Sequence, residues 1–141
     1  MYKGIWLFGL SGSGKTYLSK KLAKRKKKSF LIDGDIVRSF ISFDLGYRLP
    51  DRVKQNKRVL GLAKIVIKNG YFPIISCVYL DEKIYNEVRR NKIRVFNIIN
   101  DSSYKINSIL FKKRNIVGKT LKYFIYLFGN IFCYFVNKFF F

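Results

Sequence analysis

The residues with the clearest chemical meaning form a glycine-rich loop near the start of the chain. Residues 9–16 read GLSGSGKT, which matches the phosphate-binding pattern G-x-x-x-x-G-K-[ST] at every fixed position. Small residues let such a loop wrap closely around phosphate, so that backbone N–H groups and the N-terminus of the next helix point at its oxygens. We therefore predict that a nucleotide triphosphate binds here. The predicted nucleotide-binding residues are Gly9, Ser11, Gly12, Ser13, Gly14, Lys15 and Thr16.

Two side chains of this loop are expected to take part in the chemistry. Lys15 should reach the β- and γ-phosphates, where its charge is catalytic, and the Thr16 hydroxyl should ligate Mg²⁺. ATP and Mg²⁺ are therefore the predicted cofactors. The alternative is a glycine-rich turn between a strand and a helix that binds no ligand. Agreement at every fixed position of the motif favours the nucleotide site.

Two aspartates follow the next apolar run and supply carboxylates for a reaction. Residues 31–40 read LIDGDIVRSF, which contains Asp33 and Asp35. In phosphoryl transfer a carboxylate beside the attacking hydroxyl positions it, while cationic groups neutralise the charge. A phosphate-binding loop in only 141 residues, without a GTPase-like N-K-x-D pattern, favours a small-molecule kinase. Turn or cap residues are the alternative for the two aspartates.

Taken together, these motifs resemble a known family. Residues 44–52 read DLGYRLPDR and stand ahead of an amphipathic helical pattern. A GLSGSGKS/T loop, a DGDxxR element and a DLGF/Y segment followed by DR are typical of adenylylsulfate kinases, and the resemblance runs from about Gly4 to Gly70. It implies a P-loop NTPase fold. It also implies phosphoryl transfer from ATP to the 3′-hydroxyl of adenylyl sulfate, the step that makes an activated sulfate donor.

The resemblance assigns roles to individual residues. Asp33 would orient or deprotonate the acceptor hydroxyl, and Asp35 would position Mg²⁺ or substrate. Arg38 and Arg52 would grip the phosphosulfate and the nucleotide of the acceptor, a solvated helix face being the alternative for both. Gln55 stands where the family usually has asparagine, and it keeps an amide with a longer reach.

A later stretch resembles the lid of the same family. Residues 109–119 read ILFKKRNIVGK, where Lys112, Lys113 or Arg114 would neutralise charge on the transferring group as the lid closes. An ordinary basic surface loop is the alternative for this stretch.

After the third apolar run, Tyr79 and Leu80 replace the Ser-Pro pair of the family, as in similar kinases found beside capsule and surface-sugar genes. A different nucleotide-linked acceptor, used in surface-polysaccharide synthesis, therefore stays open. Asp81 follows this run. It is interpreted as a helix cap, with a Mg²⁺-associated carboxylate on a Walker B-like strand as the weaker alternative.

The elements that must position these residues alternate along the chain. Apolar runs typical of buried strands occupy residues 2–9, 29–33, 71–80 and 94–99. Helical patterns occupy residues 15–28, 51–69, about 81–91, and from 101 or 102 to about 110. The DGD segment is expected to open a turn. This order predicts one α/β kinase domain over residues 1–119, with a mainly parallel sheet and helices on both faces.

Residues 120–141 form an atypical apolar tail, TLKYFIYLFGNIFCYFVNKFFF. Three interpretations stay open. A membrane segment is one, although the 14 largely apolar residues from 123 to 136 fall short of the ~18 needed to span. A strand or helix that completes the core is another. The favoured interpretation is a truncated or frame-shifted end of an AT-rich gene, which would leave an impaired kinase.

Composition limits the choice of partners. The net charge is +21, from 29 Lys and Arg against 8 Asp and Glu, so the surface attracts polyanions. A nucleic-acid-binding module is the alternative from another class, suggested by the lysine-rich residues 24–28. Without an RNP, helix-turn-helix or zinc pattern, we expect no specific nucleic acid.

The cellular location is also constrained by the sequence. Cys77 and Cys133 have neither CxxC nor metal-ligand spacing, and no secretory signal pattern stands at the N-terminus. These features favour a reducing cytoplasm. The oligomeric state stays open, with a homodimer as one candidate.

Overall fold

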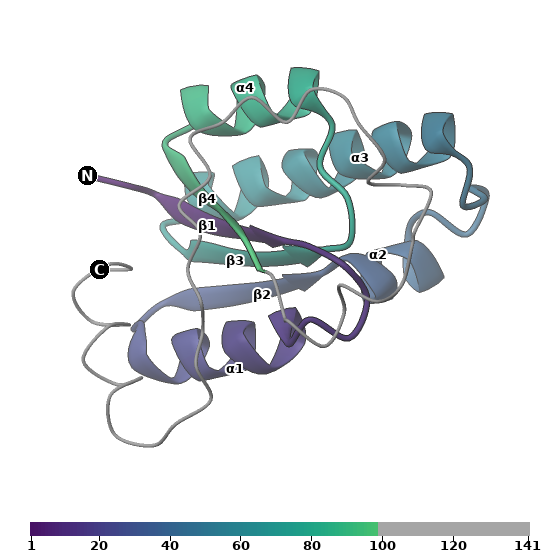
Figure 1. Cartoon of the computed structure of the whole chain (residues 1–141). Coiled ribbons are helices and arrows are strands. Elements are labelled where there is room, and N and C mark those ends of the chain that lie inside the picture. The colour runs from purple at the N-terminus through teal and green to yellow at the C-terminus, as the bar shows by residue number, and fades with distance from the viewer. Residues whose placement is uncertain (99–141) are drawn as a thin grey trace.

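The sheet of this protein, seen in a computed structural model that describes residues 1–98, has four parallel strands in the order β2-β3-β1-β4 (Figure 1). The strands are β1 (Gly4–Phe8), β2 (Ser29–Asp33), β3 (Phe72–Cys77) and β4 (Ile93–Asn97). The predicted helix that begins at residue 101 or 102, the lid segment and the apolar tail lie outside the described residues. The prediction of a parallel α/β sheet is confirmed.

Register places the ends of the strands level with one another. Phe8 at the end of β1 is the partner of Cys77 on β3, and Asp33 at the end of β2 is the partner of Ser76. Because all the strands run in the same direction, the segments that follow β1, β2 and β3 leave the sheet at one edge, called the carboxyl edge below. This edge is where ligands of open parallel sheets usually bind.

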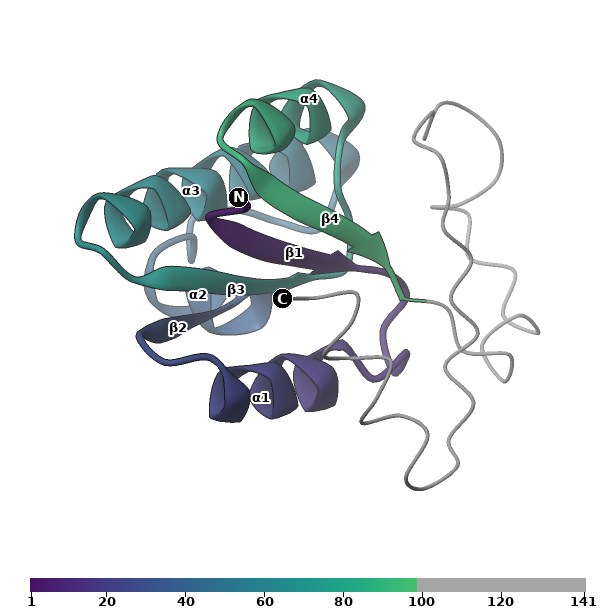
Figure 2. The same cartoon turned by 90° about the vertical axis from the view of Figure 1, so that its left-hand side faces the viewer.

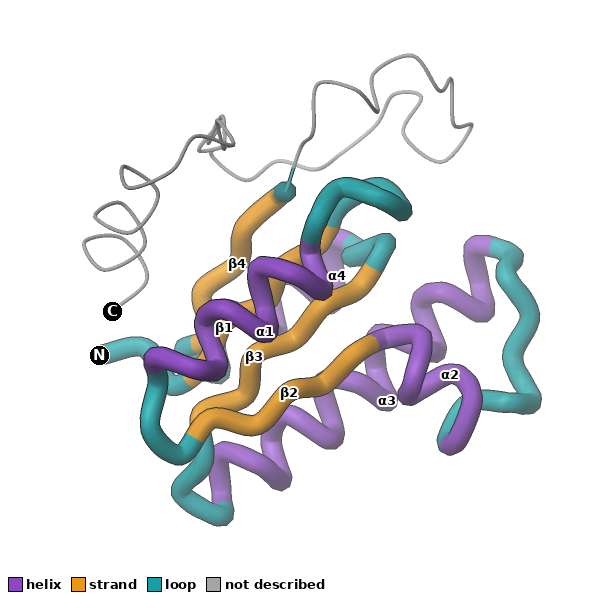
Figure 3. The backbone as a smooth tube through the Cα atoms, turned by 90° about the horizontal axis from the view of Figure 1, so that it is seen from below, coloured by secondary structure: helices purple, strands orange, loops and turns teal. Residues whose placement is uncertain are grey.

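The helices cover both faces of the sheet. The helices are α1 (Lys15–Arg25), α2 (Gly34–Phe40), α3 (Leu49–Lys68) and α4 (Glu82–Arg90). Figures 1 and 2 show α3 and α4 on one face and α1 on the other, with α2 at the carboxyl end of β2. Seen from below in Figure 3, α1 lies in front of the sheet.

Two apolar clusters hold these layers together. Trp6, Ile75 and Val59 belong to the larger cluster, which fills the space between the sheet and α3 with α4. Leu7 and Leu22 belong to the smaller cluster under α1. Side chains therefore alternate along β1 between two buried faces, which explains why its sequence is an almost continuous apolar run.

The prediction of a turn at DGD was wrong, because α2 begins directly after Asp33. The Asp33 side chain accepts a hydrogen bond of 2.9 Å from the backbone N–H of Asp35, which is the usual geometry of an N-cap. Only Val37 is buried along this helix of seven residues. The helix therefore has no apolar periodicity for sequence analysis to find.

The other helix ends follow recognisable signals. Pro50 stands in the first turn of α3, and Gly70 follows its end with a φ of 78°. Asp81 accepts a hydrogen bond of 2.9 Å from the N–H of Lys83, so its interpretation as a helix cap is confirmed. None of the helices within residues 1–98 is long and apolar enough to cross a membrane.

Candidate active site

The phosphate-binding motif lies between β1 and α1, as predicted: residues 9–14 form the loop, and Lys15 and Thr16 are the first two residues of α1. Gly12 and Gly14 have φ angles of 76° and 87°, in the left-handed region that favours glycine. Gly14 is also the N-cap residue of α1. The loop therefore takes a conformation that its glycines allow, and the N-terminus of α1 lies at the carboxyl edge.

The ammonium group of Lys15 lies against this loop. Only 8% of the residue is exposed, and its Nζ donates to the Leu10 carbonyl oxygen at 2.5 Å and to Ser13 Oγ at 3.3 Å. Burial lowers the pKa of Lys15, while the negative charges of Asp35 and Asp33 oppose this change. The lysine and both aspartates of the DGD segment thus share one electrostatic environment.

The Asp33 carboxylate joins three elements. Its Oδ2 accepts hydrogen bonds from Thr16 Oγ1 at 3.2 Å and from Ser76 Oγ at 3.0 Å. Its Oδ1 caps α2 through the N–H of Asp35. A single carboxylate therefore fixes the phosphate-binding loop, β3 and α2 relative to one another. The carboxylate of Asp35 is exposed in the first turn of α2.

Close packing explains the glycine between the two aspartates. A Cβ on Gly34 would lie 2.9 Å from Cys77 Sγ and 3.1 Å from the Ser76 carbonyl oxygen. Burial raises the pKa of Cys77 to about 12, with Asp33 acting in the same direction. Cys77 is therefore a neutral thiol that packs under the site, and it is not an activated nucleophile.

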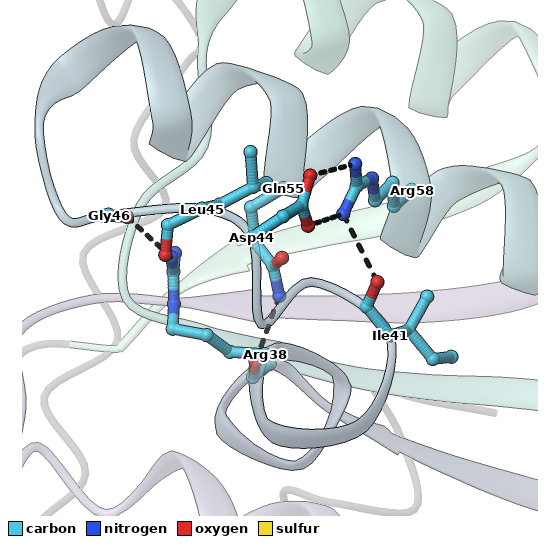
Figure 4. A network of polar contacts seen from close by, with 8 residues as sticks. Arg38, Ile41, Asp44, Leu45, Gly46, Gln55 and Arg58 are labelled. Atoms are coloured by element: carbon cyan, nitrogen blue, oxygen red, sulfur yellow. Dashed lines mark hydrogen bonds and ion pairs between the residues drawn. The ribbon is translucent and has the colours of Figure 1, made fainter.

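Arg38 and Arg52 meet around an aromatic side chain that sequence analysis did not single out. Arg38 Nη1 donates to the carbonyl oxygens of Leu45, at 3.3 Å, and Gly46, at 2.6 Å (Figure 4). Its guanidinium lies 4.7 Å from the ring centroid of Tyr47, and that of Arg52 lies 5.9 Å away. The Arg52 Nε also donates to the Tyr47 carbonyl oxygen at 2.9 Å.

The Tyr47 side chain is 68% exposed, although two guanidinium groups flank it. The ring and both cations therefore present a flat face and positive charge at the surface of the loop between α2 and α3. The only sign of this surface in the sequence was the tyrosine of the DLGY segment. Its importance depends on contacts with Arg38 and Arg52, which the segment alone does not reveal.

A second ion pair anchors this loop to α3. Arg58 and Asp44 form a two-point contact, with Arg58 Nη2 2.7 Å from Asp44 Oδ2, and Arg58 Nη1 also donates to the Ile41 carbonyl oxygen (Figure 4). The hydrogen bond from Arg58 lowers the pKa of Asp44. Sequence analysis missed this pair, since the residues stand fourteen positions apart.

Gln55 is a buried residue of α3 that contacts the backbone of the DGD segment. The residue is only 4% exposed, and its Nε2 donates to the Gly34 carbonyl oxygen at 2.9 Å (Figure 4). Its Oε1 is buried without a hydrogen-bond partner in the part of the chain that the structure describes. This placement ties α3 to the backbone between the two aspartates. The predicted substrate contacts of Lys112 and Lys113 lie outside the described residues.

The residues present are compatible with Mg²⁺. Within residues 1–98 there is no cluster of three or more His, Cys, Asp and Glu side chains that could hold a metal by themselves. Mg²⁺ usually binds through one or two carboxylates together with water and substrate phosphates. The Thr16 hydroxyl beside the Asp33 carboxylate supplies hard oxygen atoms of the required kind.

The parallel sheet, the glycine-rich loop and the lysine at the start of α1 define the P-loop NTPase fold, which confirms the predicted fold class. Within that fold, the profile of one family, adenylylsulphate kinase, matches residues 2–107. The chain belongs to the adenylylsulfate kinase family, as the resemblance of its motifs predicted.

Relatives with curated descriptions support the same family. The chain is 36% identical over 90 residues to an adenylyl-sulfate kinase of Picosynechococcus, an alignment that covers 61% of this chain and 51% of the relative. It is 40% identical over 78 residues to adenylyl-sulfate kinase 3 of Arabidopsis thaliana, covering 52% of this chain and 38% of the relative. The chain thus spans about half the length, or less, of these relatives.

A solved structure shows the same arrangement. The APS kinase CysC of Mycobacterium tuberculosis, in complex with AMPPNP and APS, is 25% identical with a TM-score of 0.58. The match covers 68% of this chain and 60% of that protein.

Proposed function

We propose that this chain transfers the γ-phosphoryl group of ATP to the ribose 3′-hydroxyl of adenylyl sulfate. The observation that carries the proposal is the hydrogen bond of 3.2 Å between Thr16 of the phosphate-binding loop and Asp33 of the DGD segment. It brings the predicted nucleotide site and the predicted acceptor carboxylates together at one edge of the sheet. Adenylyl sulfate is proposed as the acceptor because the chain belongs to the adenylylsulfate kinase family.

The nucleotide side of the site would work through charge and position. Lys15 now donates to the Leu10 carbonyl oxygen and to Ser13 Oγ, and it would exchange these contacts for phosphate oxygens. Thr16 and Asp33 would hold Mg²⁺, which would neutralise charge on the β- and γ-phosphates. The N–H groups of the loop and of the first turn of α1 would bind the remaining oxygens.

The geometry favours separate roles for the two aspartates. Asp33 is engaged by Thr16, Ser76 and the N–H of Asp35, so it suits a positioning role beside the metal. Within residues 1–98 the exposed Asp35 carboxylate accepts no side-chain hydrogen bond, and it opposes the lowering of the Lys15 pKa more than Asp33 does. We therefore assign to Asp35 the task of orienting or deprotonating the acceptor hydroxyl, which exchanges the roles that the resemblance implies.

The acceptor side would use the exposed ring and the two arginines. The Tyr47 ring offers a surface for stacking the base of a nucleotide, and Arg38 and Arg52 supply positive charge for its phosphosulfate. Gln55 acts as a positioning residue, since it is buried and holds the Gly34 carbonyl oxygen. Lys112 and Lys113 stay predicted contacts of the closing lid.

Several other predictions are retained as part of this proposal. The kinase domain would extend over residues 1–119, with residues 120–141 as a separate apolar tail. A reducing cytoplasm and a homodimer are compatible with it. A kinase of another nucleotide-linked acceptor is the second candidate, because Tyr79 and Leu80 replace the Ser-Pro pair of the family.

A panel of acceptors tests the proposal. Release of ADP is measured in a coupled assay with Mg²⁺-ATP and adenylyl sulfate, or other nucleotides with a free 3′-hydroxyl. We expect turnover that depends on adenylyl sulfate and that disappears in Lys15→Ala. Preference for a different nucleotide would move the assignment to the second candidate, and absence of turnover with every acceptor would refute both.

A further inference from the structure

A basic hollow lies at the amino edge of the sheet, the end of the strands opposite the phosphate-binding loop. Its volume is about 250 Å³, and of the seven residues within 1–98 that line it, five are cationic. The lining residues are Lys3, Lys64, Ile67, Lys68, Arg90, Asn91 and Lys92. In Figure 1 this edge is on the left, where the chain begins and where α3 and α4 end. None of these residues belongs to the candidate active site.

The fold brings these cations together from separate segments. Lys3 precedes β1 and Lys92 precedes β4, and the N–H of Lys3 donates to the Lys92 carbonyl oxygen at 2.8 Å. Lys64 and Lys68 stand four residues apart on α3 and therefore share one face of that helix. The hollow is thus built on secondary-structure elements, and its charge does not come from a single flexible loop.

The charge of the hollow is only partly balanced. Lys64 pairs with Glu87 at 2.5 Å, and both side chains are 44% exposed. The other four cations have no acidic partner within residues 1–98. Each helix C-terminus contributes roughly half a negative charge, so α3 and α4 together with Glu87 leave a net charge of about +3. This charge attracts anions.

Stabilisation of helix ends does not explain all of these cations. Lysine and arginine in a last turn interact favourably with the helix dipole, which accounts for Lys68 and Arg90. Lys3 belongs to no helix. Lys92 has a φ of 58°, whereas the end of α3 has Gly70 in the left-handed region. Lys28, outside the hollow, has a similar φ of 54°, so this conformation does not by itself explain the charge of Lys92, which like Lys3 stands outside the helices.

We propose that this hollow binds a compact phosphorylated anion with the charge of a diphosphate group. A volume of about 250 Å³ corresponds to roughly eight water molecules, enough for a diphosphate group. Lysine and arginine side chains form charge-assisted hydrogen bonds with phosphate oxygens. Among the described residues that line the hollow there is no aromatic side chain on which bases of a nucleic acid could stack, which favours a small anion over a polynucleotide.

Titration calorimetry with inorganic pyrophosphate tests this proposal. The full chain is used in magnesium-free buffer at physiological salt, in a Lys15→Ala background that removes the phosphate-binding loop as a competing site. We expect one site, whose affinity falls about tenfold or more in Lys68→Gln/Lys92→Gly because charge-assisted hydrogen bonds are lost. The matched control is Lys20→Gln/Lys83→Gln, which removes the same charge from exposed positions on α1 and α4.

The design separates loss of binding from loss of folding. Lys92→Gly places the favoured residue in a left-handed conformation, which offsets the loss of the Lys68 charge at the end of α3, so the double variant should melt close to the parent. Lys3→Gln/Lys68→Gln tests the same hollow with Lys92 unchanged and should also lose affinity. Activity of the wild-type chain is not needed for any of these measurements, so the proposed kinase function and this site can fail independently.

Three results would overturn the proposal. The first is that pyrophosphate does not bind the Lys15→Ala chain. The second is that the control variant weakens binding as much as the variants of the hollow do. The third is that an oligonucleotide binds through Lys68 and Lys92 while pyrophosphate does not, which would make the surface a nucleic-acid site.

Discussion

At the carboxyl edge of the sheet, the functional side chains are held in place by hydrogen bonds, whereas at the amino edge most of the cations have no such restraint. Asp33 alone contacts Thr16, Ser76 and the N–H of Asp35. At the amino edge, only Lys64 of the hollow has an acidic partner within residues 1–98. The first region is organised for chemistry, and the second offers charge to an anion without fixing its geometry.

The two edges also differ in where the acidic residues lie. In residues 1–98 the acidic residues other than Glu87 lie at the end of β2, in the loop before α3, or at the starts of α2, α3 and α4. The amino edge has lysines immediately before β1, β2 and β4. A parallel sheet separates the segments before its strands from those after them, so one short chain can present two charged sites.

The largest expected effect concerns the two aspartates of the carboxyl edge. Asp35→Asn should lower kcat by about 10²–10⁴-fold, the usual contribution of general acid–base catalysis, with little change in Mg²⁺-ATP affinity. Asp33→Asn should instead raise the Mg²⁺ concentration needed for activity. Steady-state rates measured across a Mg²⁺ titration distinguish them. An active Asp35→Asn beside an inactive Asp33→Asn would restore the roles implied by the resemblance.

A substitution in the backbone between these aspartates tests how tightly the carboxyl edge is packed. Gly34→Ala should destabilise the fold by about 1–3 kcal/mol, because the new Cβ would lie 2.9 Å from Cys77 Sγ. Gly61→Ala on α3 is the matched control. Its Cβ meets no atom within 4 Å, so it should stabilise the helix by up to about 1 kcal/mol. Urea unfolding measures both, and equal free energies of unfolding would contradict the packing argument.

A third prediction concerns the acceptor surface. Tyr47→Ala should raise the KM for adenylyl sulfate about tenfold through the loss of base stacking, while the KM for ATP stays the same. Tyr47→Phe keeps the ring and should behave like the parent. A proportional rise of both KM values in Tyr47→Ala would show a general disturbance of the loop and would remove the stacking role.

The smallest effect is a dependence of stability on pH. Because Arg58 holds the pKa of Asp44 below 3.8, the ion pair stabilises the fold above that pH, and this contribution is lost as the pH falls through the lowered pKa. The difference in the free energy of unfolding between the parent and Asp44→Asn should therefore shrink below about pH 4. A difference that stays constant down to about pH 3 would be inconsistent with the pair.

Local sequence signals predicted most of the secondary structure that positions the site. The glycine-rich loop and the four strands depend on residues that are neighbours in the chain, so their patterns can be read directly. The cap of α4 was found for the same reason, since Asp81 and the N–H of Lys83 are two residues apart. These elements bring the phosphate-binding loop and the DGD segment to one edge.

The missed features depend on contacts between distant residues. The stacking of Arg38 and Arg52 around Tyr47, and the ion pair of Asp44 with Arg58, exist only once α3 lies beside the preceding loop. The hollow at the amino edge needs β1, α3, α4 and β4 to meet. In a chain with 29 basic residues, no pattern of charge distinguished those that converge there.

The most direct test of the central claim is detection of the product. The chain is incubated with Mg²⁺-ATP and adenylyl sulfate, and the nucleotides are separated and identified by mass spectrometry. The account predicts adenylyl sulfate that carries one additional phosphate on its 3′-oxygen, formed in step with ADP. A folded chain that binds Mg²⁺-ATP but leaves adenylyl sulfate unmodified would contradict it.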